Sequence, residues 1–269
     1  MNLNLKEIVS SFCAENNIPM VGYAAFSRWE QPLFEPWIPA DFYPHHILPK
    51  TQSVIVMGLP VALPVLETSP SIWYHELYKT VNSLLDQYTV QLASILTRAG
   101  FPSVFVPRDG YGSIEVLLKN PVAFFSHRHA AILAGLGRFG VNNMVLTREF
   151  GPRVRFGSIF TTAMIPSDPL VEDELCIHCN KCVNFCPAHA LEEGDYPLVL
   201  TNKPACTAQS ASLNKRHISP CGICIKVCPV GEDRRVFHRE NTGIYEQGEF
   251  ISGSELLQGW DHVRRYGGG

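Results

Sequence analysis

The sequence lacks an excess of positive charge. It has 22 lysines and arginines against 25 aspartates and glutamates, which gives a formal net charge of −3. Proteins that bind nucleic acid or an anionic membrane through their overall electrostatic field carry a basic surplus. The composition therefore gives no reason to expect either kind of partner.

Long apolar runs are also absent. No segment approaches the roughly 20 apolar residues that span a bilayer. The first residues, Met1 to Lys6, lack the basic and then apolar order of a signal peptide. Hydrophobic residues make up 46% of the chain and charged residues 17%, as in a globular protein with a core. Together with the thiols described next, these features predict a cytoplasmic protein.

Cysteine is scarce outside one region. Eight of the nine cysteines lie between Cys176 and Cys228, and the ninth, Cys13, is expected to be a small buried residue. The first run reads C-x2-C-x2-C-x3-C-P, and the second run lacks only the first cysteine of that pattern. In two-cluster ferredoxins the fourth cysteine of each run ligates the other cluster.

This crossing assigns four ligands to each of two [4Fe–4S] clusters. The first cysteine set is Cys176, Cys179, Cys182 and Cys228, and the second cysteine set is Cys206, Cys221, Cys224 and Cys186. Structural zinc is the first alternative, but it uses two separated ligand pairs and needs no third cysteine at the same spacing. Disulfides are the second alternative, and they need an oxidising compartment. The spacing therefore predicts two cubane clusters.

Hydrophobic periodicity predicts an α/β chain before the cysteines. The expected helices are 5–12, 73–99 and 126–134, and the expected strands are 18–25, 53–59, 103–107, 144–147 and 153–162. The last two strands are expected to form a hairpin around Phe150–Pro152. The segment 29–49, rich in proline and aromatic residues, is expected to be a loop, and the polar tail after Cys228 can fold back over the first domain.

A glycine-rich segment, Gly135-Leu-Gly-Arg-Phe-Gly140, matches G-x-G-x-x-G. A dinucleotide site needs a strand before this motif, a helix after it and an acidic residue about 20 positions further on. Here a helix-like segment precedes the motif and strand-like sequence follows it, so a dinucleotide fold is rejected. The glycines still indicate a backbone that something approaches closely.

Several of these pieces resemble the epoxyqueuosine reductase family and the related corrinoid reductive dehalogenases. They are residues 134–143, 150–161, the two cysteine runs, the stretch 47–55 and Tyr74-His75. The resemblance implies a nitroreductase-like domain over 1–167 that holds cobalamin base-off. It further implies a ferredoxin-like domain with two [4Fe–4S] clusters over 168–235 and a C-terminal tail over 236–269.

The resemblance also implies which residues contact the cobalamin. They are Gly135, Leu136, Gly137, Arg138, Gly140, Val141, Asn142, Asn143, Arg153 and Arg155. The glycines would let the backbone approach a flat macrocycle. The two arginines alternate on the expected strand and so share a face. There they could pair with amide or phosphate oxygens of the corrinoid.

One departure from the family concerns the proton donor. The family has an aspartate before the glycines, and an ungapped alignment places Pro121 at that position. His127 and His129 lie nearby and can donate protons near neutral pH. The alternative is that both histidines are structural, so the catalytic residue stays unassigned.

The implied function is an iron–sulfur oxidoreductase that passes electrons through two clusters to cobalamin. Reduced ferredoxin or flavodoxin is the expected donor, and a small molecule or a corrinoid is the expected substrate. The missing acid, the charge of −3 and the lack of a helical-repeat extension argue against tRNA as the substrate. Two alternatives stay open: a ferredoxin-like electron-transfer protein, and a corrinoid reductase or chaperone that serves a partner enzyme.

Overall fold

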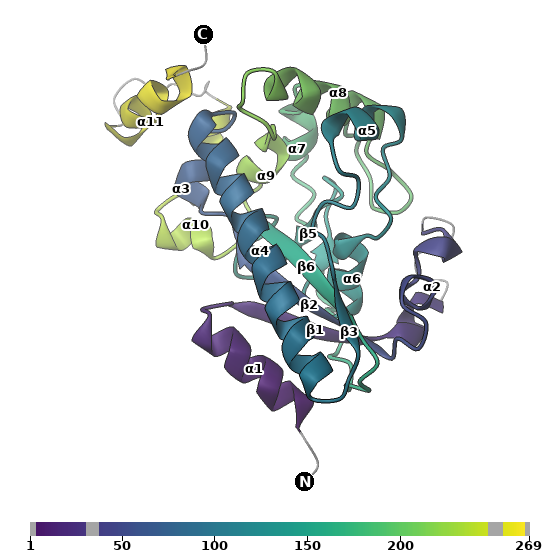
Figure 1. The fold of residues 1–269 in the computed structure, drawn as a ribbon. Coiled ribbons are helices and arrows are strands. Elements are labelled where there is room, and N and C mark those ends of the chain that lie inside the picture. Colours follow the sequence, from purple (N-terminus) through teal and green to yellow (C-terminus); the bar gives the residue numbers. More distant parts are fainter. Residues whose placement is uncertain (1–3, 31–37, 247–254, 267–269) are drawn as a thin grey trace.

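A four-stranded antiparallel sheet forms the centre of the molecule. The computed structural model describes residues 4–30, 38–246 and 255–266. The strands lie in the order β1–β2–β6–β3, and their bounds are β1 Met20–Ala25, β2 Ser53–Pro60, β6 Val154–Thr161 and β3 Ser103–Val106 (Figure 1). The apolar run of β2 is buried from Ser53 to Leu59, as expected for a central strand.

Helices cover both faces of this sheet. Helices α1 (Leu5–Glu15) and α4 (Ile72–Arg98) pack on one face with Ile55 and Ile159, and α6 (His127–Leu133) packs on the other face with Val54 and Phe160. Neighbouring residues of one strand thus enter different apolar clusters, because successive side chains of a strand point to opposite faces. The three expected helices are present within a few residues of their expected bounds.

The ends of α4 are fixed by local chemistry. The side chain of Ser71 accepts a hydrogen bond of 3.1 Å from the backbone N–H of Tyr74, which caps the first turn. Gly100 follows the last turn with a φ of +95°, the left-handed conformation that ends helices. Cys13 is buried in the core on this side of the sheet, as expected.

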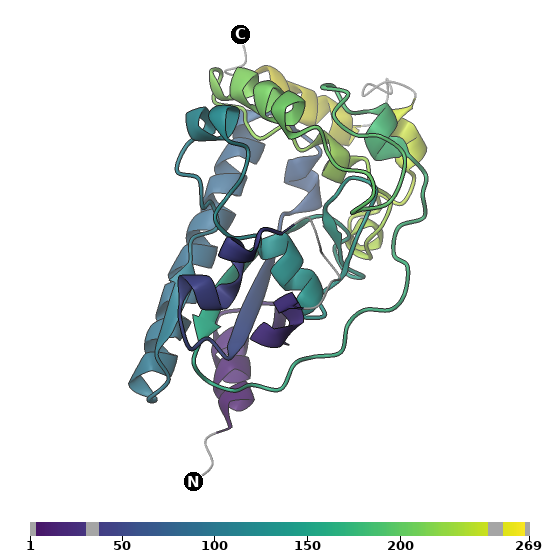
Figure 2. The same cartoon turned by 90° about the vertical axis from the view of Figure 1, so that its right-hand side faces the viewer.

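The cysteine region consists of short helices joined by loops. They are α7 (Lys181–Asn184), α8 (Lys203–Asn214), α9 (Ile223–Lys226), α10 (Asp233–Val236), η4 (Thr242–Tyr245) and α11 (Glu255–Arg265). Figures 1 and 2 place this region at one end of the sheet, with α1 at the opposite end. Helix α8 contacts α5 (Ile114–Lys119), and α11 contacts α4, so the tail does return to the first part of the chain.

The expected hairpin of 144–147 with 153–162 is wrong. Strand β5 (Val145–Leu146) pairs with β4 (Arg138–Phe139) in a separate two-stranded sheet, whereas β6 pairs with β2 and β3. A single bridge between Thr147 and Gly151 is what joins the two segments. The chain reverses instead at Asn143, which has a φ of +55°.

The expected loop over 29–49 also needs correction. It contains the end of η1 (Phe26–Glu30), η3 (Ala40–Phe42), and α2 (Pro44–Ile47), while residues 31–37 lie outside the described part of the chain. A short helix α3 (Leu63–Leu66) follows β2. Among the described residues, no helix is both long and apolar enough to cross a membrane.

Candidate iron–sulfur centre

The structure brings Cys228 next to the first cysteine run. Burial raises the pKa of the Cys182 thiol to about 12, and the nearby thiols of Cys228, Cys176 and Cys179 raise it further. Such repulsion acts between groups a few ångströms apart in a poorly hydrated site. The four members of the first cysteine set therefore lie together, although Cys228 belongs to the second run in the sequence.

The second cysteine set is brought together in the same way. Burial raises the pKa of Cys224, and the charges of Cys206, Cys221, Cys182 and Cys186 add to the rise. The charge of Cys186 also raises the pKa of the Cys206 and Cys221 thiols. Cys186 is thus placed near members of the second run, while Cys182 of the first set also lies near Cys224, so the two cysteine sets adjoin each other.

These thiols fit a metal cluster. All eight are free, and no disulfide joins any of them. Four thiols held this close resist ionisation when no cation is present, and a bound metal reverses that preference because it deprotonates its ligands. The loops that carry them bend through residues with left-handed φ, including His178 (+50°), Asn180 (+54°) and Gly222 (+71°).

A cavity lies between the first cysteine set and the glycine-rich segment. Its lining comes from both parts of the chain: Gly140, Val141, Asn142, Leu146, Cys176, Ile177, Cys179, Asn180, Cys182, Cys228, Pro229 and Val230. All four cysteines of the set line this one space. The last part of the glycine-rich segment therefore borders the cluster site itself.

The glycines of this segment are approached by the chain itself. A Cβ added to Gly135 would lie 2.1 Å from the carbonyl oxygen of Pro169, and one added to Gly137 would lie 2.1 Å from that of Leu146. The predicted need for small residues is correct, but the structure explains it by internal packing. A bound macrocycle is not required to account for either glycine.

The other predicted contacts in the segment are also engaged within the chain. Leu136 packs in the core, and Arg138 donates to the carbonyl of Glu172 at 2.7 Å. The amide of Asn142 donates to the carbonyl of Cys224 at 3.3 Å, and the Oδ1 of Asn143 accepts from the N–H of Thr201 at 2.7 Å. The two asparagines thus fasten the segment to the cysteine region.

Arg153 does not fit the predicted role of a corrinoid contact. Its guanidinium is fully buried and forms a two-bond ion pair with Asp233, with both distances 2.6 Å. Its remaining donors go to the carbonyls of Ile225, Cys228 and Val230. An arginine has five N–H donors, and all five are used here, so none is left for a ligand.

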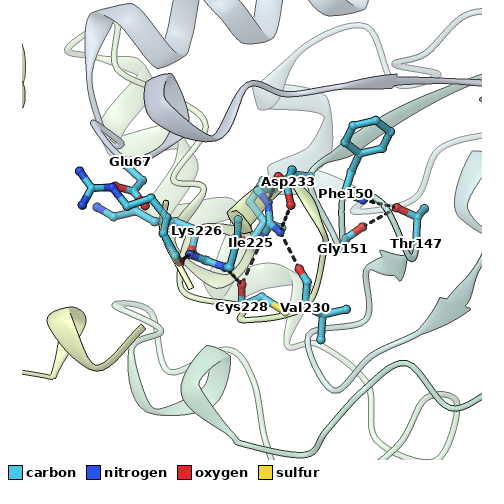
Figure 3. Close-up of polar contacts among 12 residues, drawn as sticks. Glu67, Thr147, Phe150, Gly151, Ile225, Lys226, Cys228, Val230 and Asp233 are labelled. Atoms are coloured by element: carbon cyan, nitrogen blue, oxygen red, sulfur yellow. Dashed lines mark hydrogen bonds and ion pairs between the residues drawn. The ribbon is translucent and has the colours of Figure 1, made fainter. Parts of the chain in front are cut away.

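The turn before β6 presents Arg153 to the cysteine region. The hydroxyl of Thr147 accepts from the N–H of Phe150 and donates to the carbonyl of Gly151 (Figure 3). A Cβ on Gly151 would lie 1.9 Å from the carbonyl of Val230, so only glycine fits this close approach. Arg153 therefore acts as a buried clamp between the sheet and residues 225–233 of the cysteine region.

Arg155 lies in a polar group that sequence reasoning missed. Its Nε donates to Asn82 at 3.0 Å, and its guanidinium lies 4.6 Å from the ring centre of Tyr78. Its Nη2 lies 3.5 Å from Asp109, which also accepts from the hydroxyl of Tyr111 at 3.1 Å. We call these residues the Arg155 group, and it combines a cation, a carboxylate, an amide and two phenols. Its members are Tyr78, Asn82, Asp109, Tyr111 and Arg155.

A helical spacing could have revealed this group. Tyr74, Tyr78, Asn82 and Asp86 follow one another four positions apart, so they form a polar stripe on one face of α4. Tyr74 also borders the second cysteine set, because a Cβ on Gly222 would lie 2.7 Å from its ring. The stripe thus runs from the second cysteine set to the Arg155 group.

His127 and His129 have structural surroundings. The Nε2 of His127 donates to the carbonyl of Pro107 at 3.0 Å, and its Nδ1 pairs with the hydroxyl of Ser158 at 2.8 Å. His129 bridges Ser126 and the hydroxyl of Tyr196. Burial lowers the pKa of His127 to about 4 and that of His129 to about 3. Both rings are therefore neutral near pH 7 and have no proton ready to donate.

Residues 169–192 match the 4Fe-4S binding domain family. The chain is 27% identical over 195 residues to a tetrachloroethene reductive dehalogenase of Dehalobacter restrictus, a match that covers 66% of the chain and 33% of the relative. It is 37% identical over 123 residues to an epoxyqueuosine reductase of Bacillus anthracis, over 43% of the chain and 32% of the relative.

Solved structures of both groups share the fold. A catabolic reductive dehalogenase superimposes with a TM-score of 0.64 at 17% identity, over 97% of this chain and 37% of the other. The epoxyqueuosine reductase of Streptococcus thermophilus gives 0.60 at 16% identity, over 98% and 82%. The chain is related to the reductive dehalogenases and the epoxyqueuosine reductases.

This relationship confirms the resemblance seen in the sequence. It also confirms the prediction of a mixed α/β fold and of an iron–sulfur domain. The chain spans about a third of the length of the curated relatives that it matches. What the relatives act on is therefore not carried over to this chain by similarity alone.

Proposed function

We propose that this chain is an iron–sulfur oxidoreductase with two [4Fe–4S] clusters, one on each cysteine set. The observation that supports the proposal is that Cys228 lines one cavity with the first run, whereas Cys186 lies near Cys206 and Cys221. The clusters would lie in a ferredoxin-like domain over 168–235, between a nitroreductase-like domain over 1–167 and a tail over 236–269. Reduced ferredoxin or flavodoxin would supply the electrons.

Iron and sulfide analysis after anaerobic reconstitution tests the cluster content. We expect about eight irons per chain, four for each cubane. Cys186→Ser should damage the cluster of Cys206, Cys221 and Cys224, whereas Cys13→Ser should keep the full iron content. A content near four irons, or zinc in place of iron, would refute the proposal, and loss of only the Cys176 cluster in Cys186→Ser would refute the crossing.

We further propose that the N-terminal domain receives the electrons on a bound cobalamin. Support comes from the relatives, since one structural neighbour is a dehalogenase described as B12-dependent. The glycine-rich segment and Arg153 do not fit as its contacts, because both are engaged by the chain itself. The Arg155 group fits better, since four of its five side chains are half-buried, and Tyr74 lies between this group and the second cysteine set. When bound, cobalamin would supply the metal that passes electrons to a substrate.

Titration of the reconstituted protein with cobalamin tests this second step. We expect the absorption spectrum of the corrin to shift and the cofactor to remain bound through gel filtration. Arg155→Gln should weaken retention, whereas Arg138→Gln, an exposed arginine outside the Arg155 group, should not. Iron-loaded protein that neither shifts the spectrum nor retains cobalamin would favour the alternative of a ferredoxin-like electron-transfer protein.

We propose a small molecule rather than epoxyqueuosine in tRNA as the substrate. Pro121 offers no carboxylic acid, and the two nearby histidines are neutral and fully hydrogen-bonded. A positioned acid contributes roughly two to four orders of magnitude in rate. An anaerobic assay on epoxyqueuosine-containing tRNA should therefore show turnover lower by about that factor than a reductase of that family. Equal turnover would overturn this part of the proposal.

A further inference from the structure

Two buried guanidinium groups meet at the backbone of Cys228. Arg153 donates to its carbonyl oxygen through Nη1 at 3.1 Å, and Arg234 donates through Nε at 2.7 Å. Arg153 is completely buried and Arg234 is 2% exposed. Figure 3 shows Cys228 among Ile225, Lys226, Val230 and Asp233, which are the surroundings of this contact. Two cations thus lie beside one ligand of the first cysteine set.

The two guanidiniums differ in how their charge is balanced. Arg153 is neutralised by its two bonds to Asp233. Within the described part of the chain, every acceptor of Arg234 is neutral. These acceptors are the carbonyls of Lys226, Cys228 and Arg239 and the hydroxyl of Tyr245. Arg234 therefore holds a buried positive charge that no adjacent carboxylate cancels.

Other charges around this site leave a positive surplus. The carboxylate of Glu67 reaches Arg234 only through the Tyr245 hydroxyl, and it pairs instead with Arg239 at 3.3 Å. The guanidiniums of Arg153, Arg234 and Arg239 thus face two carboxylates, those of Asp233 and Glu67.

The sulfur of Cys228 lies close to both guanidiniums. Both hydrogen bonds end on the carbonyl of the residue that carries this sulfur, so both cations lie within one residue of the ligating atom. A charge that favours a thiolate also favours extra negative charge on a cluster ligated by that thiolate. A [4Fe–4S] cluster gains one negative charge on reduction, and its potential depends on nearby charge and hydrogen bonds. Charge interactions are weakly screened in a buried site.

We propose that Arg234 is a positioning residue that raises the reduction potential of the cluster on the first cysteine set, with Asp233 opposing it. The step concerned is the transfer of one electron from the reduced donor to the oxidised cluster, and no bond is made or broken. The inference rests on the proposed function, because it requires that Cys228 ligate this cluster.

Redox titrations of the reconstituted protein, followed by electron paramagnetic resonance, test the proposal. Arg234→Met removes the uncancelled charge and should shift the midpoint potential of the first cluster to a lower value. Asp233→Asn leaves Arg153 uncompensated and should shift the same midpoint to a higher value. Arg235→Met removes one charge from an exposed neighbour and should leave the midpoint unchanged. The second cluster should shift less than the first in each variant.

Opposite shifts distinguish an electrostatic role from a structural one. A midpoint that stays constant in both Arg234→Met and Asp233→Asn, or that falls in both, would overturn the inference. If Arg234→Met does not retain iron, Arg234→Lys takes its place with Asp233→Asn, and the charge-preserving variant should keep the wild-type midpoint. A wild-type protein without two clusters would instead contradict the proposed function, so the two failures are distinguishable.

Discussion

The sheet region and the cysteine region are stabilised in different ways. The sheet buries apolar side chains on both of its faces, in two clusters that draw on α1, α4 and α6. Between residues 176 and 246 the buried apolar side chains are few: Ala190, Leu191, Leu213, Ile218, Ile225, Val227 and Tyr245, together with the Cys228 thiol. In their place the cysteine region has the buried guanidinium of Arg234, which donates to carbonyl oxygens of its own loops.

This difference indicates which of the two regions depends on a bound cofactor for its stability. Apolar burial stabilises the sheet by about 25 cal/mol for each Å² removed from water and needs no ligand. A region with little apolar burial depends on metal bonds and on polar contacts with its neighbour. The predictions below separate these two kinds of stabilisation.

Removal of the clusters should have the largest effect, and it should be confined to the cysteine region. Chelation together with ferricyanide should abolish the amide protection of α8 and α9 in hydrogen exchange, because the metal bonds of this region contribute its folding energy. Strands β2 and β6 should keep their protection. An iron-saturated chelator serves as the control, and equal loss of protection in β6 would contradict the division.

Arg153→Met should weaken the connection between the two regions. The substitution leaves the carboxylate of Asp233 buried without a partner, and breaking such a pair costs about 3–5 kcal/mol. Denaturant unfolding of the reconstituted protein measures the loss. Arg148→Met removes an exposed arginine that pairs with Asp173 and should cost less than about 1 kcal/mol. Equal losses in the two variants would show that Arg153 does not clamp the regions.

Leu92→Ala should destabilise the sheet region. Leu92 is completely buried beside Ile159, and truncation of a buried leucine costs about 2–5 kcal/mol. The loss should be similar with and without iron–sulfur clusters, since the apolar core around Leu92 contains none of the eight cysteines of the two sets. Leu198→Ala, at a side chain that is 85% exposed, should change stability by less than about 0.5 kcal/mol. A loss from Leu92→Ala that differs between iron-loaded and iron-free protein would contradict the division between the two regions.

Acidification should have the smallest effect, and it should act at the junction of the regions. His129 joins α6 to Tyr196, and burial lowers its pKa from 6.5 to about 3. The neutral ring therefore stabilises the fold fully above pH 6.5, and this contribution falls as the unfolded chain becomes protonated below that pH. Between pH 6.5 and 5.5 the loss is about 1 kcal/mol.

Urea unfolding at pH 7 and pH 5.5 checks this dependence. His129→Gln can retain hydrogen bonds without titrating, so its stability should vary less with pH than that of the wild type. His178 is an exposed histidine whose pKa is raised beside Asp195, so the stability that it contributes grows as the pH falls. It therefore provides a control whose pH dependence has the opposite sign to that of His129. If the stability of His129→Gln varies with pH as much as that of the wild type, His129 is not the source of the pH dependence.

Much of the sheet could be predicted from the sequence, and the cysteine spacing makes a definite prediction of the two cysteine sets. Alternation and apolar runs place β2 and β6 because these strands are buried on both faces, which leaves a strong local signal. The cysteine spacing predicts the exchange of Cys186 and Cys228 because cluster geometry fixes which thiols can meet. In both cases a short stretch of sequence contains the physical constraint.

Partners that are distant in the sequence could not be predicted in this way. The strand-like residues Val145 and Leu146 were paired with the wrong segment, since periodicity identifies a strand but not its neighbour. Gly137 and Arg153 were assigned to a ligand because their types suit one, yet their partners are a carbonyl of β5 and a carboxylate in α10. The stripe on α4 was not predicted, because hydrophobic periodicity identifies the helix from its apolar residues and says nothing about Tyr78 or Asn82.

The place of β6 in the chain has a consequence for how the protein is made. It is the last strand of the sheet, and it ends at Thr161, before the first cysteine of either run. During synthesis the sheet can therefore form while the cysteines are still emerging. The proteins that deliver iron and sulfide would then meet a folded sheet. Arg153, directly before β6, would bind residues 225–233 once they emerge.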